Sequence, residues 1–177
     1  MSAIELMGMV GLTPLVPDTP EFETAIRLYC DIFDNDYDLV SGRFERHTTY
    51  PDYRGFLALD GDEVVGYVYG YTSARGQFYH ESLRAVMPEE VANAWLADCF
   101  EFVELGVAAH ARRNGIGRLL HDALLDGLPH ETSVLTTHVE NDAARCMYEG
   151  LGWQVIHRPF VLDGGSEMVV MGKRLRD

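Results

Sequence analysis

The hydrophobic pattern opens with a strand and an amphipathic helix. A β-rich run over residues 9–16 stops at Pro17 and predicts the first strand. Asp18 or Thr19 then supplies an N-cap, and Pro20 supplies a proline suited to the first turn of a helix. Behind this cap, apolar residues recur at helical spacing, at Phe22, Ile26, Tyr29 and Phe33. The pattern predicts a helix that buries one face.

The middle of the chain carries a hairpin pattern. A second, weaker helical pattern covers about residues 37–46, and residues 51–54 predict a turn. Two β-rich runs, 56–59 and 64–71, flank the tight turn Asp60-Gly61-Asp62 and predict two antiparallel strands. Pro88 then opens a helix that reaches Leu96, and residues 100–107 return to a strand.

The last third alternates helices with strands. A helical pattern over residues 115–128 ends at Gly127 and Pro129. After it come a strand at 133–139, a short helix at 143–149, and two strands at 153–160 and 168–175 around a turn at 163–165. The order β-α-α-β-β-α-β-α-β-α-β-β predicts an α/β fold in which a mixed sheet carries helices on both faces. Repeats and linker-like segments are absent from the sequence, so we expect a single domain over residues 1–177.

Composition narrows the class of protein. The chain is 47% hydrophobic and 24% charged, an ordinary globular balance. Its apolar runs are shorter than the roughly 20 residues that span a bilayer, and its first nine residues lack the basic start of a secretion signal. We therefore expect a soluble, cytoplasmic protein without a membrane partner.

Charge and metal-binding residue types exclude further classes. The net charge of −14 argues against nucleic acid as a partner, because binding phosphates needs clustered positive charge; it is compatible with steering cationic substrates. The three cysteines are widely spaced, and the seven histidines lack the spacing of metal ligands. We expect free thiols and no metal.

One segment carries the chemistry. A strand over residues 101–107 leads into the turn Arg112–Gly117 and directly into an amphipathic helix, so unpaired backbone N–H groups point at one spot, which suits an anion. Gly115 and Gly117 permit a close approach of backbone to phosphate, and a pyrophosphate is the natural ligand. The turn does not match the dinucleotide-binding fingerprint G-x-G-x-x-G, because Leu120 stands where the third glycine is needed. It does not match a nucleoside-triphosphate loop either, because such a loop needs a lysine and the only lysine of the chain is Lys173.

The chain here resembles a known family. The stretch E-L-G-V-A-A-H-A-R-R-N-G-I-G-R-L-L, residues 104–120, resembles the signature of GNAT N-acetyltransferases, and N-D-A-A-R-C-M-Y-E-G-L-G-W, residues 141–153, is similar to their second block. The chain departs from the family pattern at Ala109 and His110, where a proline is common, and at Trp153, where Phe is commoner. The resemblance implies a single GNAT-like domain with a central, mostly antiparallel sheet and a parallel, splayed pair of strands at the cofactor site.

The resemblance also implies how acetyl-CoA binds as co-substrate. The backbone of Leu105, Gly106 and Val107 is expected to pair with the pantetheine arm, and Gly106 fits such a close approach, although a glycine can also mark a kink. Asn141 is expected to cap its helix and to contact the arm. The residues expected to hold the pyrophosphate are Arg112, Arg113, Asn114, Gly115, Ile116, Gly117 and Arg118.

Three side chains are candidates for proton transfer. Tyr148 matches the family tyrosine that gives a proton to the departing CoA sulfur. The attacking amine must lose a proton, and Glu101 or Glu104 can accept it through a water. On a regular strand these two glutamates face opposite sides, so only one faces the cleft unless a bulge intervenes. Glu104 is preferred, because it matches a glutamate common at this point in the family.

The sequence predicts acetyl transfer from acetyl-CoA to a primary amine, of a small molecule or a protein, by direct attack in a ternary complex. Two alternatives stay open: a non-catalytic acyl-CoA-binding sensor or assembly module of the same fold, and a longer acyl chain. A homodimer through the apolar C-terminal strands is a further expectation. Aromatic residues are candidates for an acceptor pocket, namely Tyr29, Tyr50, Tyr53, Tyr69, Tyr71 and Tyr79 with His80.

Overall fold

The computed structural model describes residues 9–161 and 165–177, with only the backbone of residues 158 and 159. The N-terminal segment 1–8 and most of the predicted turn 163–165 lie outside these residues. The chain divides into two compact units, and each is described by itself: the chain up to Tyr71 with Val103–Gly127, and Thr72–Phe102 with the chain from Leu128.

The first unit is built on an antiparallel meander. Strands β1 (Val10–Pro14), β2 (Arg54–Asp60) and β3 (Glu63–Thr72) pair in that order, with a bulge between Ala58 and Leu59. Helices α2 (Pro20–Phe33) and α3 (Tyr37–His47) connect β1 to β2. The second half of β4 (Cys99–Val107), the 3-10 turn η1 (Ala109–Ala111) and α6 (Ile116–Leu125) complete the unit.

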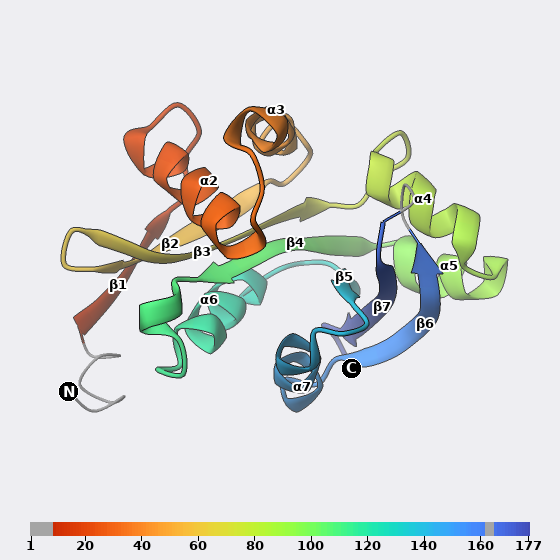
Figure 1. Cartoon of the computed structure of the whole chain (residues 1–177). Coiled ribbons are helices and arrows are strands. Elements are labelled where there is room, and N and C mark those ends of the chain that lie inside the picture. The colour runs from red at the N-terminus through yellow and green to blue at the C-terminus, as the bar shows by residue number, and fades with distance from the viewer. Residues whose placement is uncertain (1–8, 162–164) are drawn as a thin grey trace. The chain divides into compact units, whose positions relative to one another are not determined.

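Helices cover both faces of this meander (Figure 1). Side chains alternate along β3, so Tyr67, Tyr69 and Tyr71 join the cluster formed with α2 and α3, where all three are at most 1% exposed. Gly66, the residue before Tyr67, faces α6, because a Cβ there would lie 3.0 Å from Leu120 Cδ1. This packing fixes β3 and the end of β4 between two layers of helix.

The second unit joins a parallel pair to an antiparallel pair. The first half of β4 runs parallel to β5 (Thr132–His138), with Cys99 opposite Thr132 and Glu101 opposite Val134. Strand β7 (Glu167–Arg174) is antiparallel to β5 and to β6 (Gln154–Val161). Helices α4 (Phe78–Val86) and α5 (Glu89–Leu96) pack on this sheet through Leu83, Met87 and Trp95, and α7 (Asp142–Gly150) follows β5.

The strand order, β1-β2-β3-β4-β5-β7-β6, agrees with the predicted mixed sheet and with its parallel pair at β4 and β5. Thr19 is the cap of α2, accepting from the N–H of Phe22, whereas Asp18 has a left-handed φ of 60°. Helix α6 is shorter than predicted and ends at Leu125, ahead of Gly127 with its φ of 70°. The splaying of the parallel pair stays a prediction.

Helix α4 was not predicted. Its N-cap, Gln77, makes no side-chain capping bond, and the face that it buries includes the polar His80 beside Leu83. Because a capping signal and a continuous apolar stripe are both lacking, the sequence pattern did not reveal a helix here. The predicted acceptor-pocket residues Tyr79 and His80 lie on this helix.

Candidate active site

The turn after β4 is held by its own side chains. Arg112 Nε donates to the carbonyl of Val107 at 3.1 Å, and Asn114 Nδ2 donates to the carbonyls of Ala111 and Arg112 at 3.1 and 3.0 Å. Arg113 and Gly115 both adopt left-handed φ angles, 64° and 79°. Gly115 suits this conformation, whereas Arg113 adopts it at some cost in free energy.

Helix α6 begins with amides that no intrahelical bond uses. The first intrahelical bond joins the N–H of Leu119 to the carbonyl of Gly115 at 3.0 Å. The N–H groups of Ile116, Gly117 and Arg118 precede it, and Gly115 supplies no side-chain cap. Together with the positive end of the helix dipole, these amides are suited to bind an anion.

Gly106 is required by packing within the first unit. A Cβ at this position would lie 2.6 Å from Cε1 of Tyr67, which is fully buried on β3. Any larger residue would therefore displace a core ring. A flexible kink is not needed to explain this glycine. The predicted pairing of Leu105–Val107 with a pantetheine arm involves backbone groups, so it stays a prediction.

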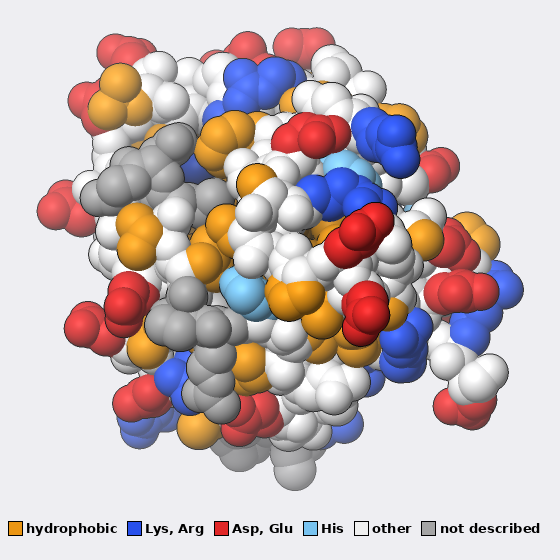
Figure 2. Space-filling model, turned by 90° about the vertical axis from the view of Figure 1, so that its right-hand side faces the viewer, with side chains coloured by type: hydrophobic (Ala, Val, Ile, Leu, Met, Phe, Trp, Pro, Cys, Tyr) orange, Lys and Arg blue, Asp and Glu red, His pale blue; other side chains and the backbone are white. Residues whose placement is uncertain are grey.

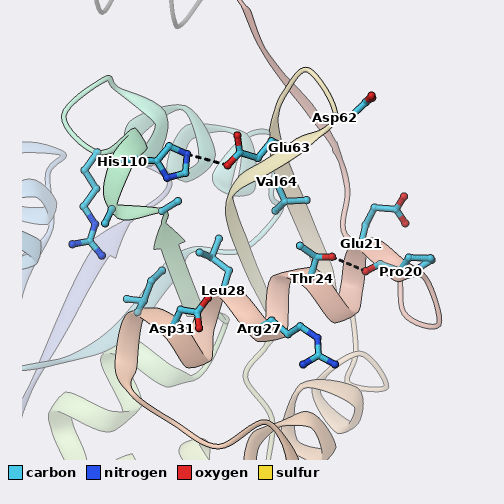
Figure 3. A pocket seen from close by; sticks show the side chains of 14 residues that line it. Pro20, Glu21, Thr24, Arg27, Leu28, Asp31, Asp62, Glu63, Val64 and His110 are labelled. Atoms are coloured by element: carbon cyan, nitrogen blue, oxygen red, sulfur yellow. Dashed lines mark hydrogen bonds and ion pairs between the residues drawn. The ribbon is translucent and has the colours of Figure 1, made fainter.

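A pocket of about 840 Å³ lies beside this turn in the first unit (Figure 3). Its lining comes from α2, from the β2–β3 turn and from the segment after β4, and His110 Nε2 contacts Glu63 Oε1 at 3.1 Å within it. Carboxylates outnumber arginines on the lining, so its charge favours a cation over a phosphate. Its charged residues are Glu21, Arg27, Asp31, Asp62, Glu63 and Arg112, with His110.

Glu104 is paired with a residue that the sequence analysis missed. Arg43 Nη2 on α3 lies 3.5 Å from Glu104 Oε1, and the two side chains are 27% and 14% exposed. Burial raises the pKa of Glu104 to about 7, although the charge of Arg43 opposes the rise. The signal for Arg43 was its place among Val40, Phe44 and His47 on the buried face of a helix.

Glu101 lies in a different environment in the second unit. It is 4% exposed, and its Oε2 has no hydrogen-bond partner among the residues that the structure describes. Burial raises the pKa of this carboxyl to about 8. At neutral pH Glu101 is therefore mainly protonated, which is a poor state for a general base.

The alternation of β4 breaks at the preferred glutamate. Val103 packs against the cluster that contains Tyr29, Phe44 and Tyr69, and the next residue, Glu104, reaches Arg43 on the same side. A regular strand would turn consecutive side chains to opposite faces. The irregularity that the sequence analysis allowed for is therefore present at Val103 and Glu104.

Helix α7 carries Asn141 and Tyr148 in the second unit. Asn141 is the N-cap, with its Oδ1 accepting from the N–H of Ala144 at 3.2 Å, so its capping role is confirmed. Tyr148 is 7% exposed, and its ring meets Phe102 and Trp153 edge to face at 5.8 Å each. Trp153 thus fills the position of the commoner Phe as a packing partner of Tyr148.

The candidate acceptor-pocket tyrosines of the first unit are mostly core residues. Tyr29 and Tyr69 stack around Phe44, and Tyr69 Oη is hydrogen-bonded to Nδ1 of the buried His47 at 2.8 Å. Tyr53 donates to the carbonyl of Leu15 at 3.0 Å. Tyr50 and Tyr71 pack edge to face at 4.8 Å. These contacts account for the rings without a substrate.

Comparison with known proteins decides the family. A family model described as the acetyltransferase (GNAT) family matches residues 19–153. The chain belongs to the acetyltransferase (GNAT) family. The match contains both glutamates, the turn after β4 and Tyr148. No curated protein matches the chain.

Solved structures share the GNAT fold of this chain. Ard1 from Thermoplasma volcanium has a TM-score of 0.69 at 15% identity, covering 96% of this chain and 99% of that protein. Aminoglycoside 6'-acetyltransferase type Ii has a TM-score of 0.68 at 18% identity, and the match covers 94% of this chain and 98% of that protein. The ribosomal-protein-S18-alanine N-acetyltransferase from Escherichia coli has a TM-score of 0.61 at 16% identity, and the match covers 94% of each protein.

GNAT proteins are acyltransferases that use acetyl-CoA as co-substrate and act on amine acceptors. The helix-start amides of Ile116, Gly117 and Arg118 and the left-handed Gly115 fit the phosphates of that co-substrate. Within residues 9–161 and 165–177, no group of three or more metal-binding side chains is found. Among the helices of these residues, none is both long and apolar enough to span a membrane.

One face of this GNAT chain mixes side chains of both charges. On the face shown in Figure 2, acidic, basic and hydrophobic side chains are interspersed. The acidic excess of the sequence is therefore not gathered into one block on that face.

Proposed function

We propose that this protein transfers an acetyl group from acetyl-CoA to a primary amine by direct attack in a ternary complex. One observation carries the proposal: the strand that ends in the anion-binding turn also bears Glu104, a carboxyl whose pKa of about 7 suits a general base at neutral pH. We further propose that the two compact units work as one acetyltransferase domain over residues 1–177.

The proposed co-substrate site combines backbone and side-chain groups. The amides of Ile116, Gly117 and Arg118 bind the pyrophosphate, and the guanidinium groups of Arg112, Arg113 and Arg118 add positive charge. Asn114 and Gly115 keep the turn in shape through the hydrogen bonds and the φ angle described above. The backbone of Leu105–Val107 and the side chain of Asn141 hold the pantetheine arm. Bound in this way, acetyl-CoA supplies the activated acetyl group.

Glu104 takes the proton of the attacking amine. An ammonium has no lone pair, so a carboxylate must accept its proton, directly or through a water, before attack. Glu104 is about half ionised near pH 7, which leaves it both available and sufficiently basic. Glu101, with a pKa of about 8, is the weaker candidate.

Tyr148 gives a proton to the departing sulfur. A thiolate leaving into an apolar site is costly, and a phenol can supply the proton that neutralises it. The edge-to-face contacts with Phe102 and Trp153 support this role, because they restrict the ring to one orientation.

The acceptor we propose is a cationic amine. The net charge of −14 favours the approach of a cation. Proteins of the same fold include an aminoglycoside acetyltransferase and an enzyme that acetylates an alanine of a ribosomal protein, so small molecules and protein termini both belong in a test panel.

The test combines binding with turnover. Acetyl-CoA is titrated by calorimetry, and then amines, including aminoglycosides, polyamines and an alanine-terminated peptide, are screened for release of free thiol. We expect micromolar binding and a rate with some amine that falls about 100-fold or more in Tyr148→Phe. Tyr37→Phe at the start of α3 is the matched control and keeps the rate, because Tyr37 lies outside the proposed site.

Each alternative has its own outcome in this test. Failure of acetyl-CoA to bind would contradict the phosphate-binding role of the turn. Binding without turnover of any amine would favour the sensor or assembly module. Tighter binding and faster turnover of a longer acyl-CoA would replace acetyl by that chain.

A further inference from the structure

Arg43 reaches Glu104 across an aromatic surface within the first unit. It leaves α3 on the face that buries Val40 and Phe44, and its guanidinium lies 5.1 Å from the ring centroid of Tyr29 and 5.7 Å from that of Phe44. Nη2 ends 3.5 Å from Glu104 Oε1. A guanidinium and a carboxylate are both costly to withdraw from water, so each favours the presence of the other here.

We propose that Arg43 is a positioning residue for Glu104, holding its carboxylate in place on β4 and adjusting how readily it accepts a proton. This inference rests on the proposed function, in which Glu104 is the base. It assigns a role to α3, an element outside both sequence blocks that carry the family resemblance.

The looseness of the contact matters for this role. A bidentate arginine with short hydrogen bonds would hold a carboxylate firmly ionised and depress its pKa. Here one nitrogen approaches one oxygen at the outer limit of hydrogen bonding, and the buried Nε of Arg43 has no partner in the described part of the chain. The guanidinium therefore offsets only part of the effect of burial, and the pKa of Glu104 stays near neutrality.

The other titratable groups around the pair keep one protonation state. Burial raises the pKa of Tyr29, and it raises those of Tyr67 and Tyr69 well above the ordinary value. Burial and the charge of Arg43 lower the pKa of His47 to about 3, so this ring is neutral. The pKa of Arg43 is raised by Glu104 against the effect of burial, so it remains charged. Between about pH 5 and 9, Glu104 is the group of this set that titrates.

The experiment compares Arg43→Gln and Arg43→Lys with Arg46→Gln. Arg46 is an exposed arginine of the same helix, so its replacement removes the same charge without touching the pair. We measure kcat/KM against pH with the amine found above. Loss of the cation raises the pKa of Glu104, so Arg43→Gln is expected to lower kcat/KM about tenfold at pH 6 and to change it little at pH 9. KM for acetyl-CoA stays constant.

The conservative variant separates charge from packing. Arg43→Lys retains the cation and is expected to keep the pH profile within about threefold of the wild type, as is Arg46→Gln. A uniform loss at every pH in both Arg43 variants would overturn the proposal in favour of a packing role.

A second measurement is independent of activity. The pKa of Glu104 is followed by NMR of its labelled side-chain carboxyl in the free protein, and it is expected to rise in Arg43→Gln but not in Arg46→Gln. This rise without turnover of any amine would keep the positioning role and remove the proposed function. Turnover of an amine together with an unshifted pKa of Glu104 in Arg43→Gln would keep the proposed function and remove the positioning role of Arg43.

Discussion

Glu101 and Glu104 lie on one strand but in different compact units, and their surroundings differ. Glu101 is buried with an unpartnered carboxylate oxygen among the described atoms, and its pKa rises to about 8. Glu104 is partly buried beside Arg43, and its pKa rises to about 7. Burial alone moves the pKa of Glu101 beyond neutrality, whereas at Glu104 the charge of Arg43 opposes the effect of burial, and the pKa stays in the range that suits a base.

The largest expected effect comes from replacing each of these two carboxyls by an amide. Glu104→Gln is expected to lower kcat/KM at pH 7 by about 100-fold or more, because it removes the base. Glu101→Gln is the matched control and is expected to stay within about threefold of the wild type. Steady-state kinetics at saturating acetyl-CoA decide the matter. The reverse order of the two variants would transfer the role of base to Glu101.

The next largest effect is the influence of Glu101 on the free energy of unfolding. Its pKa in the folded state is about 8 against an ordinary 4.5, so the folded protein holds a proton that the unfolded chain releases. The contribution of this proton to the free energy of unfolding is fully present below about pH 4.5 and is lost as pH rises through 8. Glu101→Gln is therefore expected to increase the free energy of unfolding by roughly 5 kcal/mol at pH 9 and to leave it nearly unchanged at pH 4. Urea titrations at both pH values test this, and an equal change at both would contradict it.

A smaller effect of opposite sign belongs to His47 in the first unit. Its pKa in the folded state is about 3 against an ordinary 6.5, so the unfolded chain takes up the proton first. Its contribution is present above pH 6.5 and is lost as pH falls towards 3. Between pH 7 and 4, the wild type is expected to lose about 3 kcal/mol more stability than His47→Gln. Thermal unfolding at both pH values measures the difference; parallel losses would show that His47 is protonated without cost.

Local signals predicted most of the elements correctly. Thr19 and Pro20 mark the start of α2, and the Asp60-Gly61-Asp62 turn marks the β2–β3 hairpin, because these residues act on their own backbone. Helix α4 lacked such a signal. Its buried face contains His80, which is hydrogen-bonded to Ser73 Oγ at 2.9 Å, and a polar residue with a partner does not look buried in a sequence.

In the candidate site, too, local features could be predicted from the sequence and contacts between distant residues could not. The turn after β4 and the start of α6 were readable, because glycine spacing and a helix start dictate where amides point. The partner of Glu104 was not readable, because Arg43 is 61 residues away along the chain. The reason for Gly106 was equally hidden, since it depends on the ring of Tyr67 on another strand.

The family, the order of helices and strands, and the glycine-bearing turn before α6 could be predicted from the sequence, because all three depend on neighbouring residues and on the two matching blocks. The tertiary structure was needed to show that Glu104 has a cationic partner, that Glu101 has a carboxyl oxygen without a hydrogen-bond partner in the described chain, and that the surroundings of the two carboxyls shift their pKa values differently. The physical reason is that the pKa of a buried carboxyl depends on solvent exclusion and on charges brought close by folding, and neither quantity is local in sequence.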